Sequence, residues 1–299
     1  MATTVAEQAA AVPLLKRRWQ GLPYWLILPT LGYLAVFFAW PMVKSFQLAF
    51  QDVAGDWSFD SISRMYHDHE FQPALRFTLL LVVVIVPLQF VIAFVMALIV
   101  NATLRGRGLI LFIFILPLAV SDLAAGLVWQ QIFTDHGYLN TILQHLGIID
   151  QPTIWIDPTH SNWLLGEVVL TEMWRSTSFI MIILVAGMQG IPKEFGEAAE
   201  VFGAGFWQRI RNVTLPMLKP ALQVALLFRI IFAFEVFASV IAITGRAKTT
   251  LAGESLRWQG EYLDPHVASA YALLILVLSL VAAGIAVRAL RTPKERLLR

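Results

Sequence analysis

Ionisable side chains inside long apolar stretches are the residues of this sequence best placed to do chemistry. Glu172 and Arg175 stand three positions apart in one stretch, Arg229 and Glu235 six apart in another, and Asp122 lies in a third. The spacing of Glu172 and Arg175 allows them to pair on one helical face. A charge at the bilayer centre costs roughly 2.5–3.5 kcal/mol on insertion scales, so such groups usually face a bundle interior or a watery path. We interpret them either as structural pairs between helices or as groups that contact a polar solute.

Motifs of covalent catalysis are missing from the sequence, and we expect a chain that is not an enzyme. It contains no G-x-x-x-x-G-K-[ST] loop, no H-E-x-x-H and no G-x-S-x-G. It has no cysteine, which excludes disulfides and thiolate metal sites. His67-Asp68-His69 offers two histidines without a third partner in a defined element, so we expect no metal. The net charge of +2 comes from scattered basic residues, which argues against nucleic-acid binding.

The elements that must position the buried charges are membrane-spanning helices. Hydrophobic residues make up 58% of the chain and charged residues 14%, against about 25% charged in soluble domains. About 20 apolar residues cross the hydrocarbon core. We therefore predict an all-α polytopic membrane protein with six transmembrane helices. The six stretches that qualify are Tyr24–Ser45, Leu75–Val100, Leu109–Phe133, Trp163–Gln189, Ala221–Thr244 and Val267–Leu290.

A polar segment, Ile191–Pro220, separates the fourth and fifth predicted spans. Pro192 can open a helix because its missing N–H costs nothing at the first helical position. Gly203 ends that helix, and a second amphipathic run ends at Leu215-Pro216. Two short helices that meet at a glycine make a compact knob, which fits a groove on a partner protein. Apolar residues recur at i, i+4 and i+7 in both runs, as Phe195, Ala199 and Phe202 and then as Phe206, Ile210 and Val213.

The ordered residues of this segment resemble the EAA loop of inner-membrane permeases of ABC importers. Within that group the chain is similar to the sugar family that includes the maltose and glycerol-3-phosphate permeases. In the loop, Phe202 stands where the family has Asp before the Gly-Ala pair. The stretch Arg229–Phe237 and Thr244-Gly245 also resemble the fifth span of that family, although Ala238 stands where the family has Asp after that Phe. The resemblance implies a type I ABC importer permease bundle. It also implies a contact with an ATPase subunit through Glu197, Ala198, Ala199, Gly203 and Ala204.

A substrate path is also implied by the resemblance. In maltose-type permeases the sugar is held midway by the spans that flank the EAA loop. Arginine and carboxylate groups can hydrogen-bond sugar hydroxyls, and a phenylalanine can stack on a pyranose face. The path residues implied here are Glu172, Arg175, Ser176, Phe179, Arg229, Ala233 and Val236.

The resemblance further implies an assembly of several subunits in a lipid membrane. The expected partners are a second permease, giving a heterodimer, a cytoplasmic ATPase dimer, an extracytoplasmic solute-binding protein and a small-molecule substrate. ATP and Mg²⁺ would be bound by the ATPase subunits, so we expect no cofactor in this chain. ATP would close the ATPase dimer, move the docked knob and reorient the central cavity from inside to outside.

The distribution of lysine and arginine predicts the orientation in a prokaryotic inner or plasma membrane. With both termini inside, the cytoplasmic side carries 13 of these residues and the opposite side 6, as the positive-inside rule requires. We expect a cytoplasmic segment over residues 1–23, a transmembrane permease domain over 24–290 with a coupling loop at 190–220, and a cytoplasmic tail over 291–299.

Three other functions remain open at this stage. A permease for polyamine, phosphate or molybdate would also carry an EAA loop. An ion-coupled secondary transporter could use Asp122, Glu172 or Glu235, and ATP-independent uptake by the chain alone would favour it. An intramembrane enzyme is disfavoured because the nucleophile motifs are missing.

Overall fold

A computed structural model describes residues 22–102, 106–156 and 161–290, and within these ranges the chain is helical, with one isolated β-bridge between Gln51 and Trp57. The predicted all-α class is confirmed. The terminal segments that carry many of the basic residues counted above lie outside the described ranges. The helices are α1 (Leu22–Leu34), α2 (Trp40–Ala49), α3 (Asp60–His67), α4 (Phe71–Asn101), α5 (Arg107–Ile115), α6 (Asp122–Phe133), α7 (Tyr138–His145), α8 (Ser161–Gln189), α9 (Lys193–Val201), α10 (Phe206–Arg209), α11 (Leu215–Phe234), α12 (Ala238–Thr244), α13 (Leu251–Gly260) and α14 (Pro265–Leu290).

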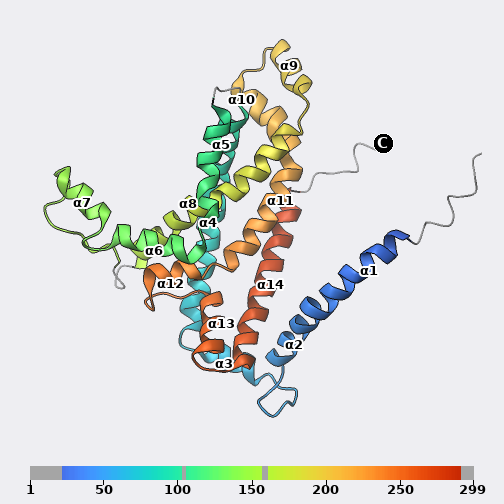
Figure 1. Cartoon of the computed structure of the whole chain (residues 1–299), viewed down its shortest axis with the longest axis vertical. Coiled ribbons are helices and arrows are strands. Elements are labelled where there is room, and N and C mark those ends of the chain that lie inside the picture. The colour runs from blue at the N-terminus through green and yellow to red at the C-terminus, as the bar shows by residue number, and fades with distance from the viewer. Residues whose placement is uncertain (1–21, 103–105, 157–160, 291–299) are drawn as a thin grey trace, which may run out of the picture.

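Four long helices, α4, α8, α11 and α14, form the centre of the bundle (Figure 1). Small residues let them approach closely, as is usual where helices pack within a membrane. A Cβ added at Gly187 of α8 would lie only 2.5 Å from the Cβ of Ala221 on α11. Ala93 and Ala97 of α4 are fully buried in the same cluster, together with Leu184. This packing places the charged residues of α8 and α11 side by side.

Five described helices are long and apolar enough to cross a membrane, and a sixth span results if one bent pair is counted. That pair covers Leu109–Phe133, which the hydropathy pattern predicts as one helix. The structure corrects this, because the segments on either side of residues 120–121 are bent by 97°. Pro117 lies in a 3₁₀ turn that ends α5, and Ser121 caps α6 by accepting a hydrogen bond from the N–H of Ala124 at 3.2 Å.

The fifth predicted span, Ala221–Thr244, is also wrong in its bounds. A continuous helical segment runs from Phe206 to Phe234, so the second run of the polar segment does not stop at Leu215-Pro216. A π-helical turn over Ile210–Thr214 precedes Pro216, and such a turn tolerates the backbone carbonyl that proline leaves unpaired. At the other end the chain breaks after Phe234 and resumes as α12.

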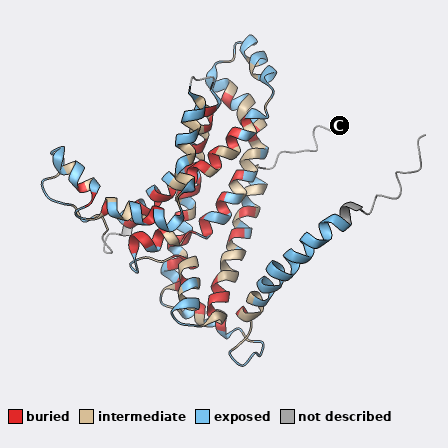
Figure 2. Cartoon of the chain, viewed as in Figure 1, coloured by how far each residue is buried: buried red, intermediate tan, exposed pale blue. Residues whose placement is uncertain are grey.

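The first span stands away from the rest of the bundle (Figure 1). Figure 2 shows α1 exposed from Trp25 onward, and none of the most apolar stretch of the span is buried. Only the end of α2 contacts the bundle, where the hydroxyl groups of Ser45 and Ser269 lie 3.3 Å apart. Trp25, Phe37 and Trp40 are more than 60% exposed. A helix this apolar needs lipid or another protein around it.

Short helices close the end of the bundle that lies opposite α9 (Figure 1). Asp68 accepts hydrogen bonds from the indole of Trp258 at 2.9 Å and the hydroxyl of Tyr271 at 2.8 Å, so it ties α3 to α13 and α14. Nδ1 of His67 lies 2.8 Å from the carbonyl of Ser63. Within the described ranges no group of three or more metal-ligating side chains is found.

Candidate functional site: a knob at one end and a charged cavity within the bundle

The knob forms at the end of the bundle where α9 and α10 meet. Gly203 adopts φ +79°, a left-handed conformation that glycine tolerates and other residues rarely adopt. The N–H of Gly203 donates to the carbonyl of Glu200 at 2.8 Å, and the N–H of Ala204 donates to the carbonyl of Ala199 at 2.9 Å. These bonds satisfy the last carbonyls of α9. The predicted reversal of the chain at Gly203 is confirmed.

Polar contacts hold the two arms of the knob together. The guanidinium of Arg209 on α10 forms an ion pair with the carboxylate of Glu200 on α9. The N–H of Gly205 donates to the side-chain oxygen of Gln208 at 2.9 Å and so caps the start of α10. The five residues implied at an ATPase contact lie on this knob, and Glu197 and Ala198 are exposed.

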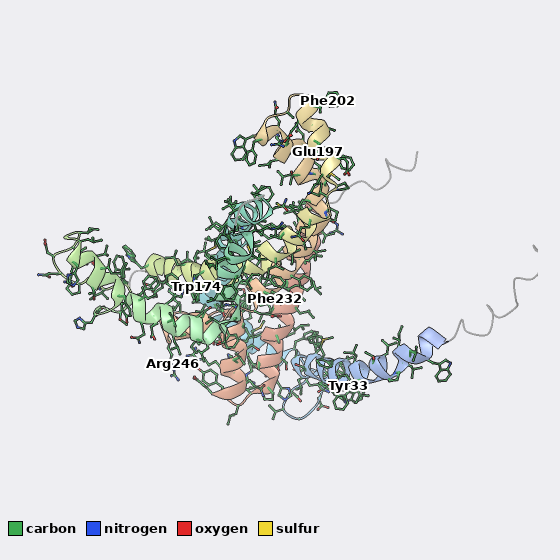
Figure 3. The ribbon with its side chains drawn as sticks, turned by 45° about the horizontal axis from the view of Figure 1, so that its top comes forward. Tyr33, Trp174, Glu197, Phe202, Phe232 and Arg246 are labelled. Atoms are coloured by element: carbon green, nitrogen blue, oxygen red, sulfur yellow. The ribbon has the colours of Figure 1, made fainter. Side chains whose placement is uncertain are left out.

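Large apolar side chains cover the surface of the knob. Val201 is 85% exposed, Phe202 89% and Trp207 76%. Figure 3 shows Glu197 and Phe202 at the far end of the molecule, away from the bundle. Exposed apolar groups gathered beside carboxylates mark a surface that contacts another protein or the membrane. Phe202 adds apolar area to this surface.

A buried polar network joins four helices at the centre of the bundle. Nη2 of Arg229 lies 3.3 Å from Oε2 of Glu172, and both side chains are almost fully buried. Nε of Arg229 donates to Gln89, which in turn donates to the backbone carbonyl of Glu172 at 2.8 Å. Ser176 and Ser239 donate to the two carboxylate oxygens of Glu172 at 3.1 and 2.9 Å. The ionised pair is thus hydrogen-bonded from α4, α8, α11 and α12, as a buried pair requires.

A second ion pair lines a cavity next to this network. Arg175 of α8 pairs with Asp122, which stands at the bend that begins α6. The pairing of Glu172 with Arg175 that their spacing allows is therefore not formed, because each meets a charge on another helix. The cavity encloses about 360 Å³ and is lined by Leu118, Asp122, Arg175, Ser176, Phe179, Arg229, Phe232, Glu235, Val236 and Phe237.

Aromatic rings form one side of this cavity. Phe179 of α8 lies edge-on to Phe232 of α11, with ring centroids 5.5 Å apart, and to Phe228 at 6.0 Å. Phe232 is 42% exposed. Figure 3 places Phe232 and Trp174 at mid-height of the bundle, between the knob and the opposite end. The cavity therefore offers both charged hydrogen-bonding groups and aromatic faces.

The seven path residues implied by the resemblance divide into two groups. Arg175, Ser176, Phe179, Arg229 and Val236 line the cavity. Ala233 does not line it and packs in an apolar cluster, and Glu172 is held inside the polar network.

Sequence reasoning missed several residues of this region. Gln89 bridges Arg229 and Glu172, and its signal was a lone amide within an otherwise apolar span. Ser239 carried no such signal, because serine is common in membrane helices. Phe237 lines the cavity only because the chain breaks between α11 and α12, which periodicity did not indicate.

The comparison with protein families matches residues 89–292 to the family described as "Binding-protein-dependent transport system inner membrane component". Among curated proteins, the chain is 30% identical over 270 residues to the trehalose transport system permease protein SugA of Mycobacterium tuberculosis, covering 87% of this chain and 85% of that protein. It is 33% identical over 238 residues to the trehalose/maltose transport system permease protein MalF of Thermococcus litoralis, covering 77% and 79%.

Solved structures share the fold. A crystal structure of a bacterial ABC transporter involved in the import of the acidic polysaccharide alginate matches with a TM-score of 0.79 at 23% identity, covering 94% of this chain and 98% of that one. A second structure, of a bacterial alginate ABC transporter in complex with an alginate pentasaccharide-bound periplasmic protein, matches with a TM-score of 0.77 at 25% identity, covering 93% and 96%. These matches confirm the predicted permease bundle.

Proposed function

Because this chain belongs to the family of binding-protein-dependent transport system inner membrane components, we propose that it is the permease subunit of an ATP-driven importer for a carbohydrate. Members of that family are membrane components of transporters, and the chain is not an enzyme. A solute-binding protein is therefore one of its partners. The sugar class is our proposal, and it is supported by the trehalose and maltose permeases among the relatives.

The cavity between α8, α11 and the α5–α6 bend is the observation that carries the proposal. Arg175 and Asp122 pair with each other in this structure. Sugar hydroxyls can replace that pairing, because they accept hydrogen bonds from the guanidinium and donate them to the carboxylate. Phe179 and Phe232 supply apolar faces for the C–H side of a sugar ring. Arg229 also lines the cavity, but its hydrogen bonds hold the helices together, so we assign it a structural role first.

We propose that the knob couples ATP hydrolysis to movement of the cavity wall. The helical segment Phe206–Phe234 begins in the knob and ends at the cavity. At 1.5 Å per residue, the 20 residues from Arg209 to Arg229 span about 30 Å. We propose that a movement of the knob is transmitted to the cavity wall along this continuous helical segment. We propose that a cytoplasmic ATPase dimer, which binds ATP and Mg²⁺, grips Glu197, Ala198, Ala199, Gly203 and Ala204. This chain then needs no cofactor of its own.

The exposed first span supports a second permease subunit beside this one. None of its most apolar stretch is buried by the described part of the chain. Lipid covers some of this surface, and we propose that a second, different permease covers the rest and completes the path. Both termini and the knob would then face the cytoplasm of a prokaryotic cell, in line with the basic residues near them.

Reconstitution tests the proposed function directly. The chain is reconstituted in proteoliposomes with the permease, ATPase and binding protein that purify with it, and uptake of radiolabelled trehalose and maltose is measured with and without ATP. ATP-dependent uptake of either sugar is expected. Uptake of polyamine, phosphate or molybdate instead would overturn the sugar assignment. Ion-driven uptake by the chain alone would support the secondary transporter that Asp122 and Glu235 leave open.

A further inference from the structure

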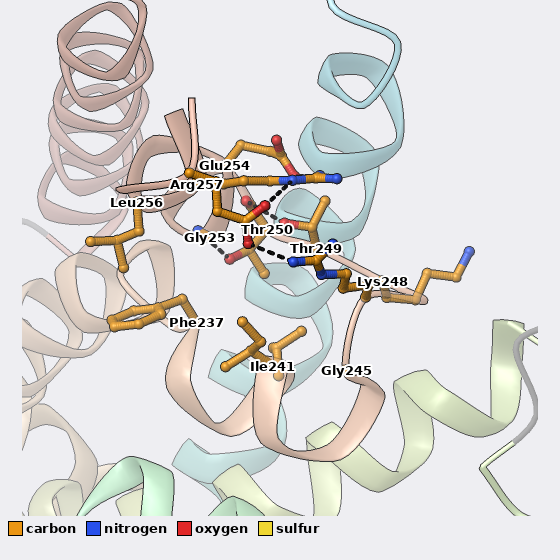
Figure 4. A pocket seen from close by; sticks show the side chains of 13 residues that line it. Phe237, Ile241, Gly245, Lys248, Thr249, Thr250, Gly253, Glu254, Leu256 and Arg257 are labelled. Carbon is orange, nitrogen blue, oxygen red and sulfur yellow. Dashed lines mark hydrogen bonds and ion pairs between the residues drawn. The ribbon is translucent and has the colours of Figure 1, made fainter. Parts of the chain in front are cut away.

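A second pocket lies between α12 and α13, at the end of the bundle opposite the knob. Its volume is about 270 Å³, just below the range of about 300–1,000 Å³ that is usual for ligand pockets. The loop that joins the two helices, with Thr249 and Thr250, forms part of its wall. Figure 4 shows Phe237 and Ile241 across from Thr249, Glu254 and Arg257. One wall is therefore apolar and the other polar.

Glu254 is the unusual member of the polar wall. Its side chain is 1% exposed. Oε1 accepts a hydrogen bond from Nη1 of Arg257 at 3.0 Å, whereas Oε2 is buried with no hydrogen-bond partner in the described structure. Burial raises the pKa of this carboxyl above its usual range. A buried acceptor without a donor is costly, and a hydroxyl group would satisfy it.

The charges around Glu254 indicate a neutral ligand. Arg257 also lies 3.6 Å from Glu261, and Glu261 accepts a hydrogen bond from Arg246 at 3.0 Å. These two arginines are already paired, so they do not form an anion site. Figure 4 shows Lys248, the remaining cation of the lining, extending away from Glu254. The carboxylate on the polar wall would itself repel an acidic group. A ligand with hydroxyl donors and no net charge fits this lining.

The apolar wall suits one face of a sugar ring. Phe237 and Ile241 stand on or beside α12, and Leu256 of α13 is 49% exposed. Phe237 also lines the cavity within the bundle, so the two hollows share one side chain. Phe237 is therefore the side chain that a path from the pocket to the cavity with Asp122 and Arg175 would pass.

We propose that the pocket between α12 and α13 is an outer subsite that binds one neutral sugar ring before it passes to the cavity within the bundle. Oε2 of Glu254 accepts a ring hydroxyl, and Phe237 and Ile241 contact the apolar face of the ring. This inference rests on the proposed carbohydrate import, because a solute of another class would not need an apolar wall opposite a hydrogen-bonding wall.

Cysteine protection tests the subsite, since the chain contains no cysteine. Leu256→Cys and Ile241→Cys place a thiol in the pocket at two independent positions, both about half exposed. Leu263→Cys, at a residue that is 77% exposed and does not line the pocket, is the matched control. Each variant is made in the full permease–ATPase complex, and labelling by a membrane-impermeant maleimide is timed with and without millimolar trehalose or maltose.

The transported sugar should slow labelling of Leu256→Cys and Ile241→Cys about tenfold and leave Leu263→Cys unchanged. Adding Glu254→Gln to either variant should remove most of that protection. Equal labelling rates with and without sugar, in a complex that imports the same sugar, would overturn the subsite and leave the proposed function standing. If the parent complex imports polyamine, phosphate or molybdate in place of sugar, the proposed carbohydrate function falls, and the subsite falls with it.

Discussion

Nη2 of Arg229 lies 3.3 Å from Oε2 of Glu172, and neither side chain is more than 2% exposed. These residues are 57 positions apart and belong to α11 and α8. Gln89, Ser176 and Ser239 satisfy the remaining hydrogen-bonding groups of the pair from three directions. A pair of this kind fixes how two helices face each other, whereas Arg175 and Asp122, in a more open site, remain free to exchange partners.

Arg229→Ala should destabilise the complex. It leaves Glu172 charged and buried without its cation, which costs about 3–5 kcal/mol. Thermal unfolding of the purified complex, followed by size-exclusion chromatography, should show a clearly lowered midpoint and less assembled material. Arg211→Ala, at an exposed arginine of the knob region, is the control and should keep the parental midpoint. An Arg229→Ala complex as stable as the parent would refute the structural role.

Arg175→Ala should alter transport while the complex stays folded. The side chain of Arg175 is 18% exposed and that of its partner Asp122 is 48% exposed, so water can solvate the Asp122 carboxylate once the arginine is removed. A lost charged hydrogen bond to the sugar is worth about 1.5–3 kcal/mol, so we expect the KM for uptake to rise at least tenfold. Arg175→Lys, which keeps the charge, should recover part of the affinity. Parental KM and rate in Arg175→Ala would remove this residue from the path.

Gly203→Leu should weaken attachment of the ATPase. The cause is backbone strain and not a steric clash, because a Cβ at Gly203 would meet no atom within 4 Å. The conformation with φ +79° is unfavourable for leucine by roughly 1–2 kcal/mol. Gly196 on α9 also has open space and no positive φ, so Gly196→Leu is the matched control. ATPase retained per permease during purification, and sugar-stimulated ATP hydrolysis, are the readouts. Equal values for both variants would contradict the requirement for a glycine at the reversal.

Glu197→Lys should have a similar effect through charge. Glu197 is exposed on α9 beside the apolar surface of the knob, so the substitution disturbs no packing inside the bundle. We expect normal membrane insertion and reduced ATPase retention. The loss of ATPase retention should be greater at low salt, where repulsion between the new lysine and a basic surface of the ATPase is less screened. Retention equal to that of the parent at every salt concentration would exclude Glu197 from the contact.

Accessibility from outside tests the orientation. Tyr138→Cys, at a residue 72% exposed on α7, should react with an impermeant maleimide added to intact cells, and Lys294→Cys should not. Asn140 is unsuitable as a reporter because it is 1% exposed and bonds Thr153 and Trp155. Labelling of both variants from outside would refute cytoplasmic termini.

The Asp264 carboxylate should make stability depend on acid pH. Burial alone would raise its pKa, but hydrogen bonds from the N–H groups of Val267 and His266 and the nearby Arg64 guanidinium hold it below its usual range. A lowered folded-state pKa stabilises above the unfolded value of about 4, and the stabilisation is lost as pH falls through the folded value. Asp264→Asn should therefore lower the unfolding midpoint at pH 7, and the gap to the parent should close as the pH falls through the lowered folded-state pKa. Asp56→Asn, at an exposed site, should show no gap.

The sequence by itself determined the class of protein, the number of apolar stretches and the position of the knob. Hydropathy is a local property, so about 20 apolar residues in a row indicate a span wherever neighbours lie. The position of Gly203 predicted where the chain reverses in the knob, because the conformational freedom of glycine is also a local property.

Only the tertiary structure decided which charges pair and where the spans break. Helical spacing allowed Glu172 to meet Arg175, yet Glu172 meets Arg229 and Arg175 meets Asp122, because helix packing brought stronger partners within reach. The 97° bend before Asp122 depends on Pro117 and the Ser121 cap acting together with the bundle around them. Ion pairs and pockets are properties of several helices at once, and no single stretch of sequence contains the distances that create them.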